Sequence, residues 1–207
     1  RYINETALFK NQWQLKTASQ SDYVRLVEEK YRPVLEDLKR EVLVAGWFQP
    51  AVVYGWFPCQ AEGNDVIIYN ADSVPAFDNV ARSPSSGQAR PGAAGLQNPR
   101  EIQRFTFPRQ KEGRKLSIAD FFAPKSSGEM DVIGLSCVTI GLRATQESHM
   151  LFEAGEYTKY LYLHGLSVET AEALAELHHK KMREELGIAG EDAPEVRDLF
   201  HQKYRGS

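Results

Sequence analysis

Cysteine is scarce in this 207-residue chain, and long uninterrupted apolar stretches are missing. Its two cysteines, Cys59 and Cys137, lie far apart without a CxxC pair. A disulfide framework and a cysteine zinc site are therefore excluded, and a reducing compartment is favoured. Glycine, glutamine and proline break the longest apolar stretch, residues 42–57, which falls short of the roughly 20 apolar residues of a membrane span. With no signal peptide visible, we predict a cytoplasmic protein without a membrane partner.

The chain also lacks an excess of charge of either sign, because 25 basic residues face 28 acidic ones for a net charge of −3. The two signs are interspersed, so no basic stripe predicts a nucleic-acid partner. None of the common nucleotide-binding, hydrolase, zinc-protease or calcium-binding motifs occurs, so no catalytic residue is predicted. Of the five histidines only His178 and His179 are close. Adjacent helical residues point about 100° apart, so no metal site is predicted.

What the chain does contain is 42% apolar residues, enough for the core of a single domain over residues 1–207. Apolar residues at partial helical spacing predict a short helix over residues 6–15, with Asn4 as a capping residue near its start. A second helix is predicted over about residues 22–42, where the apolar residues repeat at three and four positions. Pro33 should kink or split it.

A helical pattern also dominates the C-terminal third, from about residue 144 to 186. Gly165 lies inside that pattern and is predicted to kink or break the helix, while Gly187 should end it. Pro194 is placed at the first turn of a last predicted helix.

Between these helical regions, β-branched and aromatic residues predict strands. Residues 51–57 and 65–69 form a predicted hairpin, a third strand lies near Phe105, and a fourth over residues 132–142 is predicted to be buried on both faces. Residues 81–99 are dominated by small and polar types and predict a mobile surface insertion. Helices, several strands and helices again, without βαβ alternation, indicate an α+β fold with an antiparallel sheet.

Two groups of side chains can be interpreted as functional or as structural. Glu169, Glu172 and Glu176 make an acidic stripe at helical spacing, which favours a solvated face whose continuation meets the basic residues Lys180 and Arg183. Aromatic residues 47–48 and 56–57 could line a ligand cleft, but such residues in strands usually fill a core. The structural interpretation is favoured for both groups. For Asn4, a role as a helix cap is likewise favoured over a role as a ligand-binding amide.

Several motifs, in this order and spacing, resemble the reactivation (activation) domain of cobalamin-dependent methionine synthase. The first is Val53-Tyr54-Gly55-Trp56-Phe57-Pro58, a glycine-aromatic-proline strand. An L-x-x-x-D-F turn follows in residues 116–125, then D-x-I-G in residues 131–134, and the helix of residues 171–179 with its histidine. The closing residues 204–206 are similar to the family's approach to its ligand loop. The matched segments cover nearly the whole chain.

The resemblance implies a bent antiparallel sheet flanked by helices that binds S-adenosylmethionine. In this family the domain supports the reductive remethylation of oxidised cob(II)alamin to methylcobalamin, so it services a methyltransferase rather than catalysing alone. The implied partners are the cobalamin-binding domain of the same enzyme and a flavodoxin-like or flavoprotein electron donor. Zinc is implied for the parent enzyme and not for this chain.

The resemblance also implies three ligand-binding residues. Asn4 stands where the family usually has an aspartate that receives the amino group of the ligand, Glu172 at an acidic helix position near the ligand cleft, and Gln202 where an acidic residue is common. The family's Arg-x-x-x-Gly-Tyr motif would begin just after Ser207. We therefore expect a fragment that lacks part of its ligand site and binds S-adenosylmethionine weakly or not at all.

Two other hypotheses remain open. The chain could be a stand-alone, non-catalytic module that docks on a cobalamin-binding protein after losing the ligand. It could also be an unrelated α+β enzyme with a divergent site. An Arg-x-x-x-Gly-Tyr motif in the continuing reading frame would separate the methionine synthase fragment from the stand-alone module.

Overall fold

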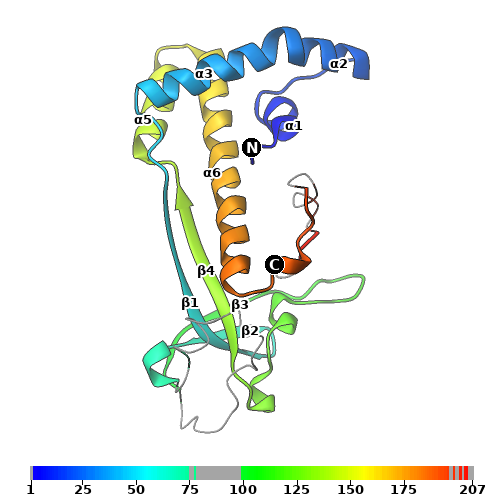
Figure 1. Cartoon of the computed structure of the whole chain (residues 1–207), viewed down its shortest axis with the longest axis vertical. Coiled ribbons are helices and arrows are strands. Elements are labelled where there is room, and N and C mark those ends of the chain that lie inside the picture. Colours follow the sequence, from blue (N-terminus) through cyan, green and yellow to red (C-terminus); the bar gives the residue numbers. More distant parts are fainter. Residues whose placement is uncertain are drawn as a thin grey trace. The chain divides into compact units, whose positions relative to one another are not determined.

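The computed structural model describes residues 2–74, 77, 99–195, 198, 201 and 203–204 (Figure 1). These residues gather into two compact units. The first unit comprises residues 1–53 and 137–179, and the second comprises residues 54–136 and 180–207. Apart from Pro99, the predicted insertion lies outside the described residues, and so does most of the helix predicted after Pro194.

The first unit opens with a short helical segment made of α1 (Glu5–Ala7) and the π-helical turn η1 (Leu8–Gln12). Asn4 caps this segment, because its side-chain Oδ1 accepts a hydrogen bond from the backbone N–H of Ala7 at 3.1 Å. The predicted helix and its predicted cap are both confirmed.

A longer helical stretch follows as α2 (Gln20–Leu26), the π-helical turn η2 (Val27–Tyr31) and α3 (Arg32–Val44). Pro33 lies in the first turn of α3, where the missing N–H of a proline is tolerated. The π-helical turn stands directly before α3, so the regular α-helix is interrupted where the sequence predicted it.

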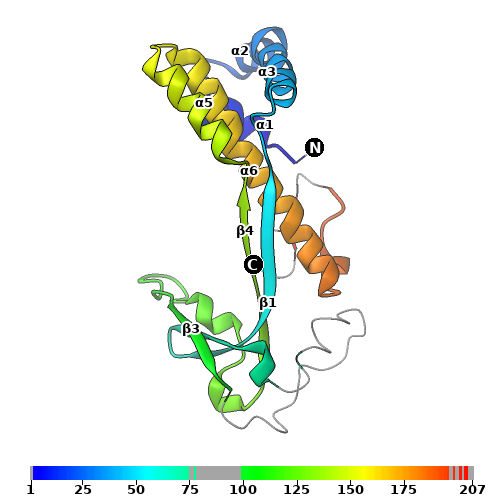
Figure 2. The same cartoon turned by 90° about the vertical axis from the view of Figure 1, so that its left-hand side faces the viewer.

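The C-terminal helical region divides into α5 (Leu142–Glu153) and α6 (Tyr157–Glu185). Figure 2 shows α5 beside the first turns of α6, where the rings of Phe152 and Tyr160 lie 5.2 Å apart. The break falls at Gly155, whose φ of +75° favours glycine. The prediction of a kink or break at Gly165 is wrong, since this residue lies inside α6.

The sheet has the strand order β3-β2-β1-β4, from β1 (Ala51–Glu62), β2 (Asp65–Tyr69), β3 (Glu101–Thr106) and β4 (Asp131–Thr139). β1 and β2 form the predicted hairpin, and its turn contains Gly63 at a φ of +64°. β2 also pairs antiparallel with β3, with Val66 opposite Phe105. The predicted α+β fold with an antiparallel sheet is confirmed.

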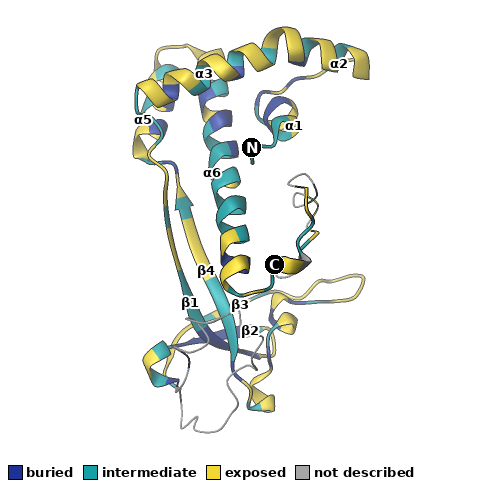
Figure 3. Cartoon of the chain, in the orientation of Figure 1, coloured by how far each residue is buried: buried dark blue, intermediate teal, exposed yellow. Residues whose placement is uncertain are grey.

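The expected burial of β4 on both faces is wrong. Its first four residues are half-buried, and most of those that follow are exposed, including Leu135 and Cys137. Figure 3 shows this contrast with β2, which is almost wholly buried. An antiparallel sheet can leave one face to solvent, so its strands need not be covered on both faces.

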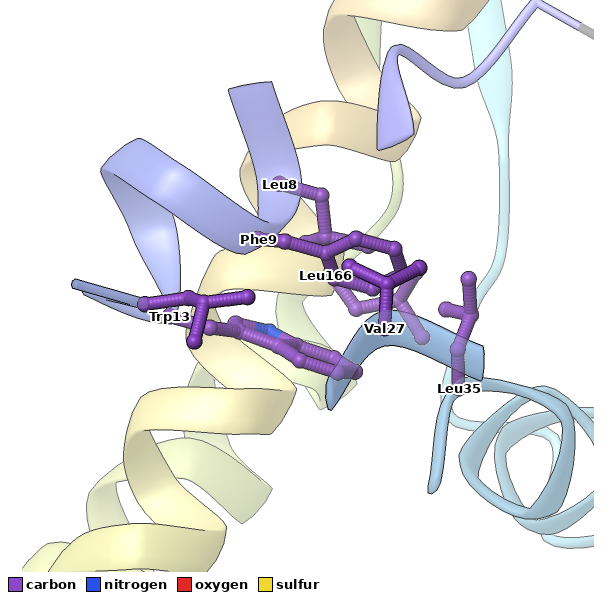
Figure 4. Packing of buried hydrophobic residues seen from close by; sticks show 7 residues of the cluster. Leu8, Phe9, Trp13, Val27, Leu35 and Leu166 are labelled. Carbon is purple, nitrogen blue, oxygen red and sulfur yellow. The ribbon is translucent and has the colours of Figure 1, made fainter. Parts of the chain in front are cut away.

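Each unit has its own apolar core. The first unit buries a helical cluster, shown in Figure 4, that consists of Leu8, Phe9, Trp13, Leu15, Val27, Leu35 and Leu166. The second unit buries two clusters around its sheet, one containing Cys59, Ala61, Val66, Ile68 and Ala119, the other Ile67, Tyr69, Val74, Phe77 and Met130. Phe48, Trp56 and Phe57 pack against these clusters, which supports the core interpretation of the aromatic residues.

Candidate functional site

The predicted ligand residues Asn4 and Glu172 both belong to the first unit. Asn4 is half-buried, and its Oδ1 is already engaged as the cap of α1. A carbonyl oxygen has two lone pairs, so one acceptor position of the amide remains for a ligand donor. Glu172 is exposed on α6 and free to reach a ligand from solvent. No hydrogen bond joins Asn4 to Glu172 among the described residues. Gln202 lies outside those residues.

A buried carboxyl group lies one turn before Glu172. Glu169 is 3% exposed, and its Oε1 accepts a hydrogen bond of 3.3 Å from Nε2 of Gln12. Burial raises the pKa of Glu169, the hydrogen bond from Gln12 lowers it, and the nearby charge of Glu172 raises it. The solvated acidic stripe predicted from the sequence is therefore wrong at Glu169, because the N-terminal segment covers this face of α6.

Gly165 lets that segment approach α6. A Cβ atom on Gly165 would lie 2.7 Å from Cβ of Gln12 and 2.9 Å from Cδ1 of Trp13, closer than carbon atoms pack. Beside it, the indole N–H of Trp13 donates to the carbonyl oxygen of Tyr162 at 3.1 Å, and the two rings are 4.5 Å apart. The glycine is required by the close contact.

The second unit contains a buried ion pair that the sequence interpretation missed. Arg183 and Asp192 have side chains that are 2% and 6% exposed, joined by two hydrogen bonds of 2.9 Å. The guanidinium of Arg183 also lies 4.1 Å from the ring centre of Tyr204. Placing Arg183 on a solvated helix face was therefore wrong. Its partner lies beyond the turn at Gly187, so helical spacing carried no signal for the pair.

The motifs that carry the family resemblance have structural tasks in the second unit. Ser117 and Asp120 form a capping box on the 3-10 turn η5 (Ile118–Phe121). Asp131 accepts a hydrogen bond from the backbone N–H of Ala123 at 2.9 Å. A Cβ atom on Gly134 would lie 2.5 Å from Cζ3 of Trp56, so the glycine of D-x-I-G is required by packing.

Electrostatic contacts hold Asp120 in its ionised form. The Arg109 guanidinium donates two hydrogen bonds to its carboxylate, at 2.6 and 2.7 Å, and the backbone N–H of Ser117 donates a third at 2.9 Å. Together they lower the pKa of Asp120 from 3.8 to about 2. Both side chains are engaged with structural partners. We therefore assign the pair to the stability of this loop and not to catalysis.

Among the residues that the structure describes, no group of three or more histidine, cysteine, aspartate or glutamate side chains is arranged to hold a metal ion. Within the same residues, no helix has the length and apolar character needed to cross a membrane.

Comparisons with known proteins identify the family. A family model described as "Vitamin B12 dependent methionine synthase, activation domain" matches residues 1–207. Two relatives named methionine synthase, from Mycobacterium tuberculosis and Mycobacterium leprae, are 35% and 34% identical over 99% and 100% of this chain. The chain spans 16% of the length of each relative.

A solved structure, described as the MetH reactivation domain bound to AdoHcy, has the same fold. It aligns with a TM-score of 0.73 and 23% identity, over 100% of this chain and 58% of that chain. The resemblance seen in the sequence motifs is confirmed by the family model and the relatives together. The chain belongs to the activation-domain family of vitamin B12-dependent methionine synthases.

Proposed function

We propose that this chain binds S-adenosylmethionine as part of a cobalamin-dependent methionine synthase, a methyltransferase, and supports its reductive reactivation. The observation that carries the proposal is the family match over all 207 residues. The bound AdoHcy named for the solved structure, which is S-adenosylmethionine without its transferable methyl group, supports the ligand class.

Cobalamin held by a neighbouring domain of the same enzyme would supply the methyl acceptor, with an electron from a flavodoxin-like or flavoprotein donor. The task of this chain is to hold the sulfonium group so that its methyl group faces that acceptor. Such positioning is itself catalytic, since it replaces a bimolecular encounter by an oriented contact. The domain would also have to leave the cobalamin domain during turnover, which requires an equilibrium between domain arrangements.

The residues proposed for the ligand are Asn4, Glu172 and Gln202. The exposed carboxylate of Glu172 suits the ligand's ammonium group or its ribose hydroxyls, because a charged acceptor strengthens either hydrogen bond. Asn4 offers an acceptor without a charge, and Gln202 would act likewise. One charged and two neutral residues predict weaker binding than an all-acidic set would give.

Calorimetric titration with S-adenosylmethionine tests the proposal. The chain is compared with a version extended along its natural reading frame by about 100 residues, enough to complete one domain. We expect binding by the extended version, and a loss of about tenfold in affinity for Glu172→Gln, since a charged hydrogen bond contributes about 1.5 kcal/mol. Glu41→Gln, an exposed change in the same unit, is the matched control and should bind normally.

Failure of both versions to bind would overturn the ligand assignment. That outcome would favour the hypothesis of a stand-alone module that docks on a cobalamin-binding protein, a function that needs no ligand pocket. The zinc of the parent enzyme and the cytoplasmic location stay predictions, separate from this test.

A further inference from the structure

The two proposed ligand residues of the first unit lie on different elements. Asn4 starts the N-terminal helical segment, whereas Glu172 lies on α6. A ligand held by both residues requires these elements to keep a fixed spacing, because small displacements in a binding site cost affinity. The contact between the two elements is therefore important for function.

That contact combines a close approach with one polar link. At Gly165 the backbone of α6 leaves room for Gln12 and Trp13, and no larger residue fits without displacing them. One turn further along α6, Gln12 donates its hydrogen bond to Glu169. Glycine inside a helix costs roughly 1 kcal/mol relative to alanine, so the approach is maintained against the helix's own preference.

Glu169 is an unfavourable residue to bury in a packed contact. A buried carboxyl group costs free energy unless it is hydrogen-bonded, and among the described residues Gln12 is its only hydrogen-bond partner. Glu169 and Glu172 are three residues apart, hence on the same face of α6. The side chain that anchors the N-terminal segment thus shares a helix face with the proposed ligand residue.

We propose that Gly165, Gln12 and Glu169 form a positioning contact that sets the spacing between Asn4 and Glu172. The inference rests on the proposed function, because it concerns the spacing of the same ligand site. None of the three residues needs to touch the ligand. Gln12 and Glu169 act through the elements that they join.

A reciprocal exchange tests the polar link. Gln12→Glu places two carboxyl groups against each other and removes the donor, whereas adding Glu169→Gln restores one donor and one acceptor in reversed order. We expect Gln12→Glu to weaken binding of S-adenosylhomocysteine by about tenfold, and the double exchange to recover it to within about threefold. Gln20→Glu, the same change at an exposed site of α2, is the matched control.

The titrations use whichever version, the chain or its extension, binds with the wild-type sequence, under conditions where urea unfolding shows every variant to be folded. A merely structural role would change stability and leave the affinity of folded protein unchanged, which overturns the inference while the proposed function stands. No binding by the wild-type sequence overturns both. The near-ultraviolet signal of Trp13, in a background where Trp47 and Trp56 are phenylalanine, reports the contact without ligand. It should change in Gln12→Glu and return in the double exchange.

Discussion

Aromatic rings fill the core of the first unit, whereas ion pairs tie down the loops of the second. In the first unit, five ring pairs among Phe9, Trp13, Tyr31 and Tyr162 have centroids 4.5 to 6.4 Å apart. They pack a short N-terminal segment onto a helix that is distant in sequence. Ring packing of this kind depends on apolar burial and shape, so it responds little to pH or salt.

In the second unit, charged side chains join separate segments of the chain in addition to its apolar clusters. Arg104 on β3 donates hydrogen bonds to Glu62, Asp65 and Glu101, and these carboxylates raise its pKa. Arg183 fixes the segment after α6 through Asp192. The two units should therefore be destabilised by different kinds of substitution. The first should be most sensitive to cavities in its core, and the second to the loss of a charged partner.

The largest effect should come from a cavity in the first unit. Phe9 is 1% exposed, and Phe9→Ala should destabilise the chain by about 4 kcal/mol, as buried aromatic truncations do. Urea unfolding measures the loss, and hydrogen exchange locates it in residues 2–53. Phe121→Ala, at a side chain that is 65% exposed, should change stability by less than about 0.5 kcal/mol. Equal losses in the two variants would contradict the assignment of the core.

A smaller loss should follow when the buried ion pair of the second unit is broken. Asp192→Ala leaves the Arg183 charge buried without its partner and should cost about 3 kcal/mol. Replacing both residues, with Arg183→Met and Asp192→Leu, should recover most of that loss, since the uncompensated charge disappears. Asp37→Ala breaks an exposed pair with Arg40 and serves as the control. A double variant as unstable as Asp192→Ala would show that packing alone explains the loss.

The structure also shows how much of the fold could be predicted from the sequence. The helices, the hairpin and the Asn4 cap follow from local patterns, namely apolar spacing, β-branched runs and a capping side chain, and the structure confirms them. Gly165 was misjudged because local pattern treats glycine as a helix breaker, whereas its role depends on Gln12, which is 153 positions away along the chain. Local rules cannot report contacts of that range.

The burial of charged side chains could not be predicted from the sequence either. Glu169 and Arg183 lie in stretches whose spacing is typical of a solvated helix face, yet both side chains are buried. Their partners, Gln12 and Asp192, come from other segments, and only the fold brings them together. The proposed ligand residues were available only through the family resemblance, since Asn4 alone is fully explained as a cap.

The smallest effect concerns the pH response that should separate the units. The folded chain lowers the pKa of Asp120 from 3.8 to about 2, mainly through Arg109, so its contribution to stability is present above about pH 4 and lost as the pH falls towards 2. Asp120→Asn removes this titration, and its urea midpoint should change less than that of the wild type between those pH values. The comparison is made with hydrogen exchange in residues 107–124, against the Asp37→Asn variant of the first unit. Asp120→Asn and Asp37→Asn could reduce the pH dependence of the urea midpoint equally. In that case the loops of the second unit do not depend on the charge of Asp120. The contrast between the two units then rests on the buried pair of Arg183 and Asp192 alone.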